Sequence, residues 1–459
     1  MKLTFCWAAK IVTWSCYLIQ TGNTKFLLDC GMFQWPKEIY RLNYEPFMFD
    51  PKEIDFVLLT HAHIDHCGLI PKLHKEWFNG KIYTTSATRD LCSILLEDSA
   101  EIQEKNTQQQ NKRRARIGQE ARLPLYTLKD ASKCMPLFSI VEYKKIYKIT
   151  DNIQVRYQDA GHIMWSASIE LFVTENWKTK KLVFSGDVWQ WDTPIIQDPT
   201  LIQDADYLFM ESTYGDRLHE DPASKEDLLL KYTLETYKKW WKLLIPSFSV
   251  ERTQELLYVF NILIKKGKFP KQKIFLDSPL SIKATEIFKK HTEYYDNEAL
   301  HKYPNPFNFP QLEYSESVED SQKLNNYNDP CIIIAWNGMC TAWRITHHLK
   351  HSLWDSKNML LFVGYQAEGT LGRSILEWEK KVKIMDAEVV VNAEIQKING
   401  FSGHADANQL MQRAKWFSKP PKKTFIVHWE ERAQIALQSQ LEKIRFKCQI
   451  PSIKDIIEL

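Results

Sequence analysis

A run of metal-binding side chains at the end of an apolar segment constrains this chain more than any other feature. Residues 56–59 are apolar, and the run His61-Ala62-His63-Ile64-Asp65-His66 follows after a single threonine, just before Gly68. Four side chains that can bind a metal therefore fall within six residues. Neutral imidazoles and carboxylates are good zinc ligands, and a turn can direct alternate residues toward two neighbouring ions. Burying so many polar groups without a ligand would be costly, so the run predicts a metal site.

Apolar runs and turns in the first half of the chain predict strands of a mixed or antiparallel sheet. These runs lie at residues 26–29, 56–60, 81–84, 169–173 and 181–185. The polar, proline-free stretch 88–122 predicts one or two exposed helices inserted on this core. From about residue 224 onward, helical and strand patterns alternate, which predicts a second, α/β domain. A chain of 459 residues also exceeds what one hydrophobic core usually serves.

Composition and cysteine usage favour a soluble protein of the cytoplasm. With 44% hydrophobic and 25% charged residues, the chain resembles an ordinary globular protein. Its first residues lack the apolar run of a signal peptide, and no stretch approaches the roughly 18 apolar residues of a membrane span. Nine cysteines without CxxC spacing favour a reducing compartment. The net charge of +3 is too small to indicate a polyanionic partner by itself.

Two further segments would be weak evidence for a metal site if they stood alone. Gly161-His162 and Ser185-Gly186-Asp187 each follow an apolar segment or a short turn. A single histidine in a glycine turn is more often a hydrogen-bonded surface residue, and an aspartate after glycine more often forms a turn. The run at residues 61–66 makes both segments candidates for the same site.

Taken in order, these segments resemble the motifs of the metallo-β-lactamase superfamily. The pattern HxHxDH, then Gly161-His162, then Ser185-Gly186-Asp187, with Asp29 at an earlier strand end, matches in order and spacing. Three later segments are similar to the further motifs of the β-CASP nucleases, at residues 211–215, 402–406 and 427–430. That family includes the endonuclease of messenger-RNA 3′-end processing and its prokaryotic relatives.

The resemblance implies an α/β fold, a metallo-β-lactamase αββα sandwich with an inserted β-CASP α/β domain. The sandwich would be split in the sequence into an N-terminal part, residues 1–215, and a C-terminal part, residues 395–459. The inserted domain would span residues 216–394. The catalytic cleft is expected between the two domains.

The resemblance also assigns the ligands of two Zn²⁺ ions, position by position. One ion would be held by His61, His63 and His162, the other by Asp65, His66 and His428, with Asp187 bridging both. Asp29 would orient a ligand histidine through its second ring nitrogen, which fixes the tautomer. Every ligand type that the family motifs require is present.

Three residues are assigned to catalysis by the same resemblance: Asp65, Glu211 and His404. Two zinc ions about 3.5–4 Å apart activate a water and polarise the phosphoryl oxygens. His404, held by Glu211, would give a proton to the departing ribose 3′-oxygen. Without the surrounding motifs, Glu211 would pass for a solvated carboxylate and His404 for an ordinary loop histidine.

RNA is the expected substrate, because DNA-processing relatives tend to carry an aliphatic residue where this chain has His428. Candidates for phosphate or RNA binding are Ser247, Arg252, Gly338, Thr341 and Arg344. The amides at the helix start before Arg344 could receive a phosphate, although an ordinary helix start explains that segment equally well. The basic run 112–116 could steer RNA, but an exposed charged helix face also explains it.

A zinc-dependent ribonuclease of RNA processing or decay is therefore the leading hypothesis. The alternatives are a DNA-directed β-CASP nuclease, a small-ester metallohydrolase and an inactive scaffold subunit of a processing complex. Small-ester hydrolases lack the inserted domain, and a scaffold would be expected to have lost a ligand. Endonucleolytic or exonucleolytic cleavage is left open, as is the oligomeric state, including a homodimer.

Glycine is unusually scarce and tryptophan unusually common in this sequence. The chain has 15 glycines and 16 tryptophans, whereas glycine usually approaches about 7% of a protein. We expect fourteen tryptophans to be glycines in the living protein, because they stand where relatives carry glycine; Trp191 and Trp416 do not. Some bacterial lineages read UGA as glycine, and translation with a table that reads it as tryptophan would produce this pattern; real aromatic substitution for RNA stacking is the alternative. The fourteen are Trp7, Trp14, Trp35, Trp77, Trp165, Trp177, Trp189, Trp240, Trp241, Trp336, Trp343, Trp354, Trp378 and Trp429.

Overall fold

The chain forms two compact units in the computed structural model. The first unit comprises Met1–Thr193, Gln197–Leu218 and His404–Leu459, and the second comprises Pro194–Ile196 and His219–Gly403. The structure describes residues 1–6, 15–34, 37–188, 190–191, 193–219, 222–341, 343–377, 379–401, 403–428 and 430–459. Within these ranges, no helix is long and apolar enough to cross a membrane.

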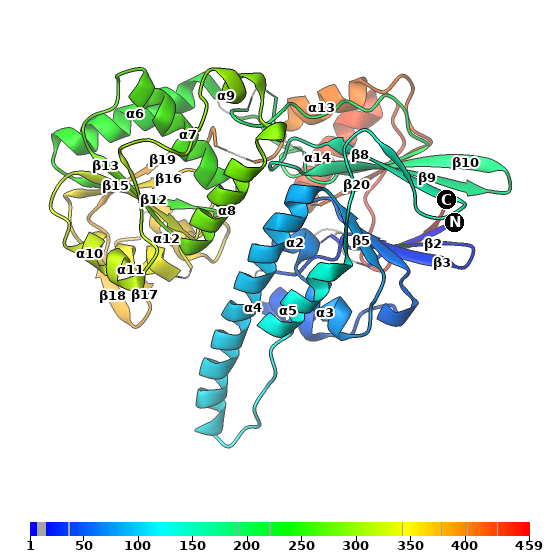
Figure 1. Ribbon diagram of the computed structural model, residues 1–459, viewed down its shortest axis with the longest axis horizontal. Coiled ribbons are helices and arrows are strands. Elements are labelled where there is room, and N and C mark those ends of the chain that lie inside the picture. Colours follow the sequence, from blue (N-terminus) through cyan, green and yellow to red (C-terminus); the bar gives the residue numbers. More distant parts are fainter. Residues whose placement is uncertain are drawn as a thin grey trace. The chain divides into compact units, whose positions relative to one another are not determined.

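Two seven-stranded sheets form the centre of the first unit (Figure 1). Their strand orders are β22-β1-β2-β3-β4-β5-β6 and β21-β20-β11-β10-β9-β8-β7. The first sheet consists of β1 Lys2–Phe5, β2 Tyr17–Thr21, β3 Thr24–Leu28, β4 Phe56–Leu58, β5 Lys81–Thr84, β6 Phe138–Ile140 and β22 Ile456–Glu458. The second consists of β7 Ile146–Lys148, β8 Ile153–Asp159, β9 Ala167–Glu175, β10 Lys178–Phe184, β11 Tyr207–Glu211, β20 Lys423–Val427 and β21 Cys448–Gln449.

Side chains from both sheets meet in one hydrophobic core. Phe26 and Phe56 of the first sheet share this core with Phe184 and Phe209 of the second. The rings of Phe184 and Phe209 stack with their centroids 4.2 Å apart. Full burial of one such side chain stabilises the fold by about 1.5–3 kcal/mol, so this shared core holds the sheets face to face.

Helices pack on the outer faces of the two sheets, and the predicted αββα sandwich is confirmed. On the second sheet, Leu410 of α13 and Leu437 of α14 share a further apolar core with Ile426 of β20. The helices of this unit are α1 Lys37–Tyr40, α2 Ile64–Cys67, α3 Ile70–Lys75, α4 Ser86–Ala115, α5 Leu128–Cys134, α13 Ala407–Lys415 and α14 Glu431–Lys443. Three 3-10 helices, η1 Arg41–Tyr44, η2 Pro51–Glu53 and η3 Met135–Leu137, lie in its connections.

The polar stretch that predicted one or two exposed helices forms a single long helix, α4. Its N-cap is Thr85, whose side chain accepts a hydrogen bond from the Thr88 N–H. Thirty residues at 1.5 Å per residue give a length of about 45 Å. The first half of α4 contains buried side chains such as Leu91 and Leu96, whereas no residue between 108 and 124 is buried. Figure 1 shows α4 running away from the sheets of its unit.

The second unit contains a six-stranded parallel sheet in the order β14-β13-β15-β12-β16-β19. Its strands are β12 Lys242–Ser247, β13 Lys273–Asp277, β14 Leu312–Tyr314, β15 Cys331–Trp336, β16 Asn358–Phe362 and β19 Glu394–Lys397, with a separate hairpin of β17 Lys381–Ile384 and β18 Ala387–Val390. Its helices are α6 Pro222–Lys238, α7 Arg252–Lys265, α8 Pro279–Lys290, η4 Thr292–Tyr294, α9 Asn297–His301, α10 Val318–Asn325, α11 Trp343–Ser352 and α12 Leu371–Leu376. Strands such as β15, buried along most of their length, are typical of a parallel sheet covered on both faces.

The sequence predicted domain boundaries after residues 215 and 394, whereas the compact units divide after Leu218 and after Gly403. The second boundary lies later because β19 pairs with β16 and so belongs to the parallel sheet of the second unit. A four-residue strand at the edge of a sheet leaves little periodic signal in the sequence, so its sheet membership was not foreseen.

Gly31 allows the loop after β3 to approach the backbone of α2. The Cys30 N–H donates to the His66 carbonyl at 2.8 Å, and the Met32 N–H donates to the Ile64 carbonyl at 2.9 Å. A β-carbon on Gly31 would lie 1.7 Å from the Asp65 carbonyl oxygen. Only glycine therefore permits both hydrogen bonds.

We predict that Gly31→Ala destabilises the protein by about 1–3 kcal/mol, because the added methyl forces the backbone of two segments apart. Urea denaturation measures the change in the free energy of unfolding. Gly364→Ala is the matched control, since a β-carbon at Gly364 would meet nothing within 4 Å. Equal stability of the two variants would contradict this account of Gly31.

Candidate metal centre

Strands of both sheets bring the predicted metal ligands to their carboxyl ends. In the first sheet β3 and β4 are parallel, and in the second β10, β11 and β20 are parallel. β8 runs in the same direction as β10, because both are antiparallel to β9. The residues that follow these strands include Asp29, His61, His162, Asp187 and His428. Predicted ligands that are distant in the sequence therefore share one edge of the sandwich.

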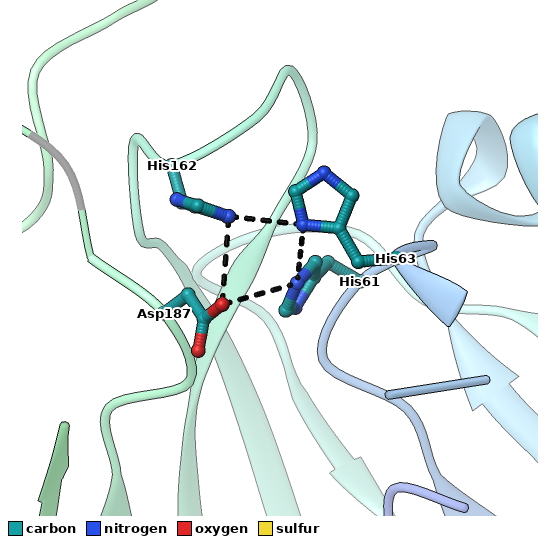
Figure 2. A group of neighbouring side chains, drawn as sticks. All are labelled: His61, His63, His162 and Asp187. Carbon is teal, nitrogen blue, oxygen red and sulfur yellow. Dashed lines mark hydrogen bonds and ion pairs between the residues drawn. The ribbon is translucent and has the colours of Figure 1, made fainter. Parts of the chain in front are cut away.

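Four of the predicted ligands form a first cluster, whose side chains point toward one another (Figure 2). His61, His63, His162 and Asp187 each offer a ligand atom, and these atoms lie within 4.8 Å of one another. The Nδ1 atom of His63 lies 3.2 Å from His61 Nε2 and 3.1 Å from His162 Nε2. Asp187 Oδ2 lies 3.7 Å and 3.5 Å from the same two Nε2 atoms.

Three more predicted ligands, Asp65, His66 and His428, form a second cluster with ligand atoms within 4.8 Å of one another. His428 Nε2 lies 3.6 Å from Asp65 Oδ2. The second oxygen of Asp187, Oδ1, lies 3.3 Å from His66 Nε2 and 3.7 Å from His428 Nδ1. One carboxylate thus faces both clusters, with a different oxygen toward each.

The two clusters fit metal ions, because their buried polar atoms have few partners. Among the described residues, His66 Nε2 and Asp187 Oδ1 are buried and face each other at 3.3 Å, and neither atom forms a hydrogen bond with another group. Leaving such an atom unsatisfied costs about 1–3 kcal/mol, which a bound cation would offset. A donor set of imidazole nitrogens and carboxylate oxygens suits zinc.

Asp29 and Thr60 hold two of the ligand histidines from behind. Asp29 Oδ2 lies 2.7 Å from His66 Nδ1, and Asp29 Oδ1 accepts a hydrogen bond from the Thr60 N–H at 2.8 Å. The Thr60 hydroxyl donates to Asp29 Oδ2 at 2.9 Å, and it therefore accepts from His61 Nδ1, also at 2.9 Å. Both histidines then turn Nε2 toward the clusters. The sequence singled out Asp29 but missed Thr60, whose one signal is its place between the strand and His61.

Burial and neighbouring charges set the protonation of these groups. Burial lowers the pKa of His61 well below its usual value and the pKa of His63 to about 4, so both rings are neutral and can act as ligands. Burial also opposes the charged form of His66, but Asp187 and Asp29 outweigh it and raise the pKa of His66 well above its usual value. A metal cation beside Asp187 would replace the proton on His66 as the positive charge that faces the carboxylate, since metal binding releases protons from ligands.

Glu211 and His404 lie beside the first cluster. His404 Nδ1 is 3.2 Å from each oxygen of Glu211, and the two imidazole centroids of His404 and His162 are 4.6 Å apart. Glu211 is 1% exposed, and its Oε1 also accepts a hydrogen bond from the Val188 N–H. The structure therefore brings together the acid pair that the sequence indicated, and an interior hydrogen bond fixes the carboxylate.

Ser247, Gly338 and Thr341, three of the predicted phosphate-binding residues, lie at one edge of the sheet in the second unit. Ser247 ends β12, and Gly338 and Thr341 follow β15, which is the parallel neighbour of β12. The crevice at the carboxyl ends of parallel strands is a common ligand site in such sheets. Their role in binding RNA remains a prediction.

The two predicted arginines are engaged within their own unit. Arg252 is 7% exposed and forms an ion pair with Glu255. Arg344 donates to Asp277 Oδ1 at 2.5 Å and to the Ser315 carbonyl at 2.6 Å. We predicted both side chains as phosphate ligands. Glu255 lies three residues after Arg252 on the same helix, whereas the partners of Arg344 come from distant segments that no local pattern shows.

Three family models match successive parts of the chain. The model of the metallo-beta-lactamase superfamily matches residues 14–99, and that of the Beta-Casp domain matches residues 253–375. The model of the Zn-dependent metallo-hydrolase RNA specificity domain matches residues 388–451. The first match includes the run at residues 61–66, and the last includes His404 and His428.

Similar proteins align over nearly the whole chain. It is 35% identical to Ribonuclease TTHA0252 of Thermus thermophilus over 440 residues, which cover 95% of each protein. It is 32% identical to the transcription termination factor FttA of Methanocaldococcus jannaschii, with 94% of this chain and 67% of that protein aligned. A crystal structure of a protein of unknown function from Enterococcus faecalis shares the fold, with a TM-score of 0.58, 12% identity and coverage of 100% of this chain and 99% of the other. The chain therefore belongs to the β-CASP family of the metallo-β-lactamase superfamily, a family of zinc-dependent metallo-hydrolases.

Proposed function

We propose that this protein is a ribonuclease that hydrolyses RNA phosphodiester bonds with two Zn²⁺ ions, in RNA processing or decay. The observation that carries the proposal is the position of Asp187, whose two oxygens face separate ligand clusters at 3.3–3.7 Å. RNA as the substrate is supported by the match to an RNA specificity domain and by the similarity to Ribonuclease TTHA0252 of Thermus thermophilus.

In this proposal His61, His63 and His162 would hold one ion and Asp65, His66 and His428 the other, with Asp187 available to both. Bound divalent ions would supply the activation of a water and the polarisation of the phosphoryl oxygens. The chain's own contribution is orientation. Asp29 and Thr60 hold His66 and His61 so that their Nε2 atoms face the clusters, and Asp65 with His428 closes the second cluster.

His404 is the residue we assign to protonation of the leaving ribose 3′-oxygen. Its Nδ1 is hydrogen-bonded to Glu211, so the proton would leave from Nε2 on the other side of the ring. The Glu211 carboxylate fixes the orientation of the ring through Nδ1, and the Val188 and Thr213 N–H groups hold that carboxylate in place. A positioned acid of this kind contributes about 10²–10⁴-fold to rate.

The thiols are compatible with a cytoplasmic protein, which we also propose. All nine cysteines are free, and eight of them are buried. Free thiols persist in reducing compartments. A homodimer remains a prediction, for which light scattering of the purified protein gives the mass in solution.

The central test is the cleavage of labelled RNA with and without a chelator. We expect cleavage that the chelator abolishes and added zinc restores. Asp187→Ala should lose both activity and bound zinc, because it removes a ligand of both ions, and His63→Ala should lose zinc from the first cluster. Asp151→Ala, which removes a carboxylate whose side chain is fully exposed, should change neither.

Two of the competing functions give different results when labelled RNA and labelled DNA are compared. An inactive scaffold would leave RNA intact with or without zinc, and a DNA-directed nuclease would cut DNA in preference to RNA. Retention of full zinc content and full activity by Asp187→Ala would remove the assignment of the site.

We predict that His404→Ala keeps its zinc yet cleaves RNA about 10²–10⁴-fold more slowly. Metal analysis and single-turnover cleavage measure the two quantities separately. An RNA analogue with an activated 3′-leaving group needs no proton donor, so the variant should cleave it nearly as fast as the wild type. The same loss on both substrates would show that His404 is not the acid.

A further inference from the structure

Four tryptophans adopt a backbone conformation that residues with a β-carbon rarely adopt. The φ angles of Trp77, Trp165, Trp177 and Trp240 are 79°, 76°, 61° and 59°. A left-handed backbone brings the β-carbon against a carbonyl oxygen, and glycine avoids this contact. A bulky side chain there is an outlier at one position, and four such tryptophans in one chain need an explanation.

The end of α7 shows which residue this conformation normally uses at a helix terminus. The Gly267 N–H donates to the Ile264 carbonyl at 2.9 Å, and the Lys268 N–H donates to the Leu263 carbonyl at 3.0 Å. The φ angle of Gly267 is 67°. This pair of hydrogen bonds is the Schellman motif, whose left-handed residue is usually glycine.

Trp77 and Trp240 end α3 and α6 with the same pair of hydrogen bonds. In both motifs the tryptophan N–H donates to the carbonyl of the residue three positions earlier. The N–H of the residue after the tryptophan donates to the carbonyl five positions before its own, and all four bonds are 2.8–3.2 Å long. The two side chains are 69% and 62% exposed. Packing of the indoles therefore offsets little of the conformational cost.

Trp177 lies in a two-residue hairpin turn between β9 and β10. Glu175 pairs with Lys178, so Asn176 and Trp177 form the loop, with φ angles of 49° and 61°. Two successive positive φ angles are typical of a type I′ turn, for which Asn-Gly is a favoured sequence. Trp177 is 98% exposed, so its side chain has almost no packing partner.

Trp165 lies in the loop that carries His162 to the metal centre. Its carbonyl accepts hydrogen bonds from the Thr85 and Thr88 hydroxyls at 3.0 Å and 3.1 Å. Both bonds use the backbone of residue 165, so glycine would keep them. Its φ of 76° therefore suits glycine at a position that helps to place a ligand.

We infer that residues 77, 165, 177 and 240 are glycine in the functioning protein, and that their codons are UGA read as glycine. Two helix ends, a hairpin turn and a ligand loop share no function, so one codon accounts for them better than four separate adaptations. Trp416, which is outside the predicted set, has φ −76° at the end of α13.

The rest of the predicted set of fourteen gives no evidence of this kind. Trp241, Trp336 and Trp354 have no positive φ, and Trp343 is the first residue of the helix α11. The remaining six, Trp7, Trp14, Trp35, Trp189, Trp378 and Trp429, lie outside the described residues.

The direct test is mass spectrometry of peptides from the protein isolated from the cells that encode it, together with the codons of its gene. We expect glycine and TGA at positions 77, 165, 177 and 240, and tryptophan with TGG at Trp191 and Trp416. Tryptophan encoded by TGG at the four positions would overturn the inference.

A stability measurement tests the same inference on recombinant protein. Trp77→Gly, Trp177→Gly and Trp240→Gly should each raise the folding equilibrium constant roughly tenfold, because each relieves a left-handed β-carbon contact. Trp416→Gly should lower it, since glycine in a helical conformation loses more chain entropy. Gly267→Trp should also lower the folding equilibrium constant. Its cost would come from the positive φ alone, because a β-carbon at this position meets nothing within 4 Å. Unchanged or lower stability in all three Trp→Gly variants would contradict the inference.

Positive charge is concentrated at the tip of α4. We define residues 108–123 as the basic arm, in which no residue is buried. It holds five basic residues and one acidic residue, a net charge of +4 in a chain whose total is +3. The basic residues are Lys112, Arg113, Arg114, Arg116 and Arg122.

The basic arm has a defined shape, and its charges are not neutralised. The Asn111 side chain forms two hydrogen bonds with the Arg122 backbone, both 2.9 Å long, which tie the returning chain to the helix. In the described part of the chain, none of the five basic side chains forms an ion pair with a carboxylate. An ordered row of unpaired cations suits a polyanion.

We propose that the basic arm binds the phosphate backbone of RNA at a distance from the cleavage site; this rests on the proposed ribonuclease function. Thr85 and Thr88 at the start of α4 bond to the loop of His162, so the helix begins beside the metal centre. Its length of about 45 Å puts the arm far beyond the reach of a dinucleotide bound at that centre.

The test is the variant Lys112→Gln, Arg113→Gln, Arg114→Gln and Arg116→Gln. Its affinity for long single-stranded RNA should fall, and the slope of log affinity against log salt should decrease by about 0.7 per removed charge. Hydrolysis of a dinucleotide should not change. The control replaces four exposed lysines of the same unit, Lys52, Lys129, Lys133 and Lys144, with glutamine.

The outcomes separate the two proposals. If the wild type cuts RNA and the arm variant has the same salt slope as the control, the basic arm does not bind RNA. If the wild type cuts no RNA in the presence of zinc, the proposed function itself is wrong.

Discussion

The contact of the Asp187 carboxylate with two groups of ligands is the interaction on which the rest of the site depends. Its two oxygens lie 3.3–3.7 Å from nitrogen atoms of His61, His162, His66 and His428. A buried carboxylate among imidazoles is unfavourable unless positive charge compensates it. The sandwich makes this arrangement possible, because parallel strands of both sheets end at the same edge and present loop residues there. Asp29 and Thr60 then fix which nitrogen of each ring faces inward.

Much of this site could be predicted from the sequence, because its ligands lie in short local motifs next to apolar strands. The run at residues 61–66 needs no knowledge of the fold to indicate a metal. Thr60 was missed, since a threonine after a strand has many explanations and its contact with Asp29 joins segments 31 residues apart. The partners of Arg344 were missed as well. Arg344 meets Asp277 across 67 residues, and no local pattern shows such a contact.

The fold was predictable to a similar degree. The strand at 81–84 was predicted at its observed bounds, and the other four predicted runs each overlap an observed strand whose ends differ by up to three residues. The end of the inserted unit was placed too early, because the short edge strand β19 has almost no periodic signal. At four tryptophans the reverse holds, because the backbone conformation indicates a different residue from the one in the sequence. Helix ends and a hairpin turn keep the geometry of glycine although the written residue is tryptophan, because the hydrogen bonds of these motifs involve the main chain alone.

Two zinc ions are proposed to bind on either side of Asp187. Anomalous diffraction at the zinc absorption edge, from crystals of the zinc-loaded protein, tests this arrangement most directly. We expect two peaks about 3.5–4 Å apart. One should be surrounded by His61, His63 and His162, the other by Asp65, His66 and His428, and the Asp187 carboxylate should contact both. A single peak, or peaks that do not contact Asp187, would contradict this arrangement.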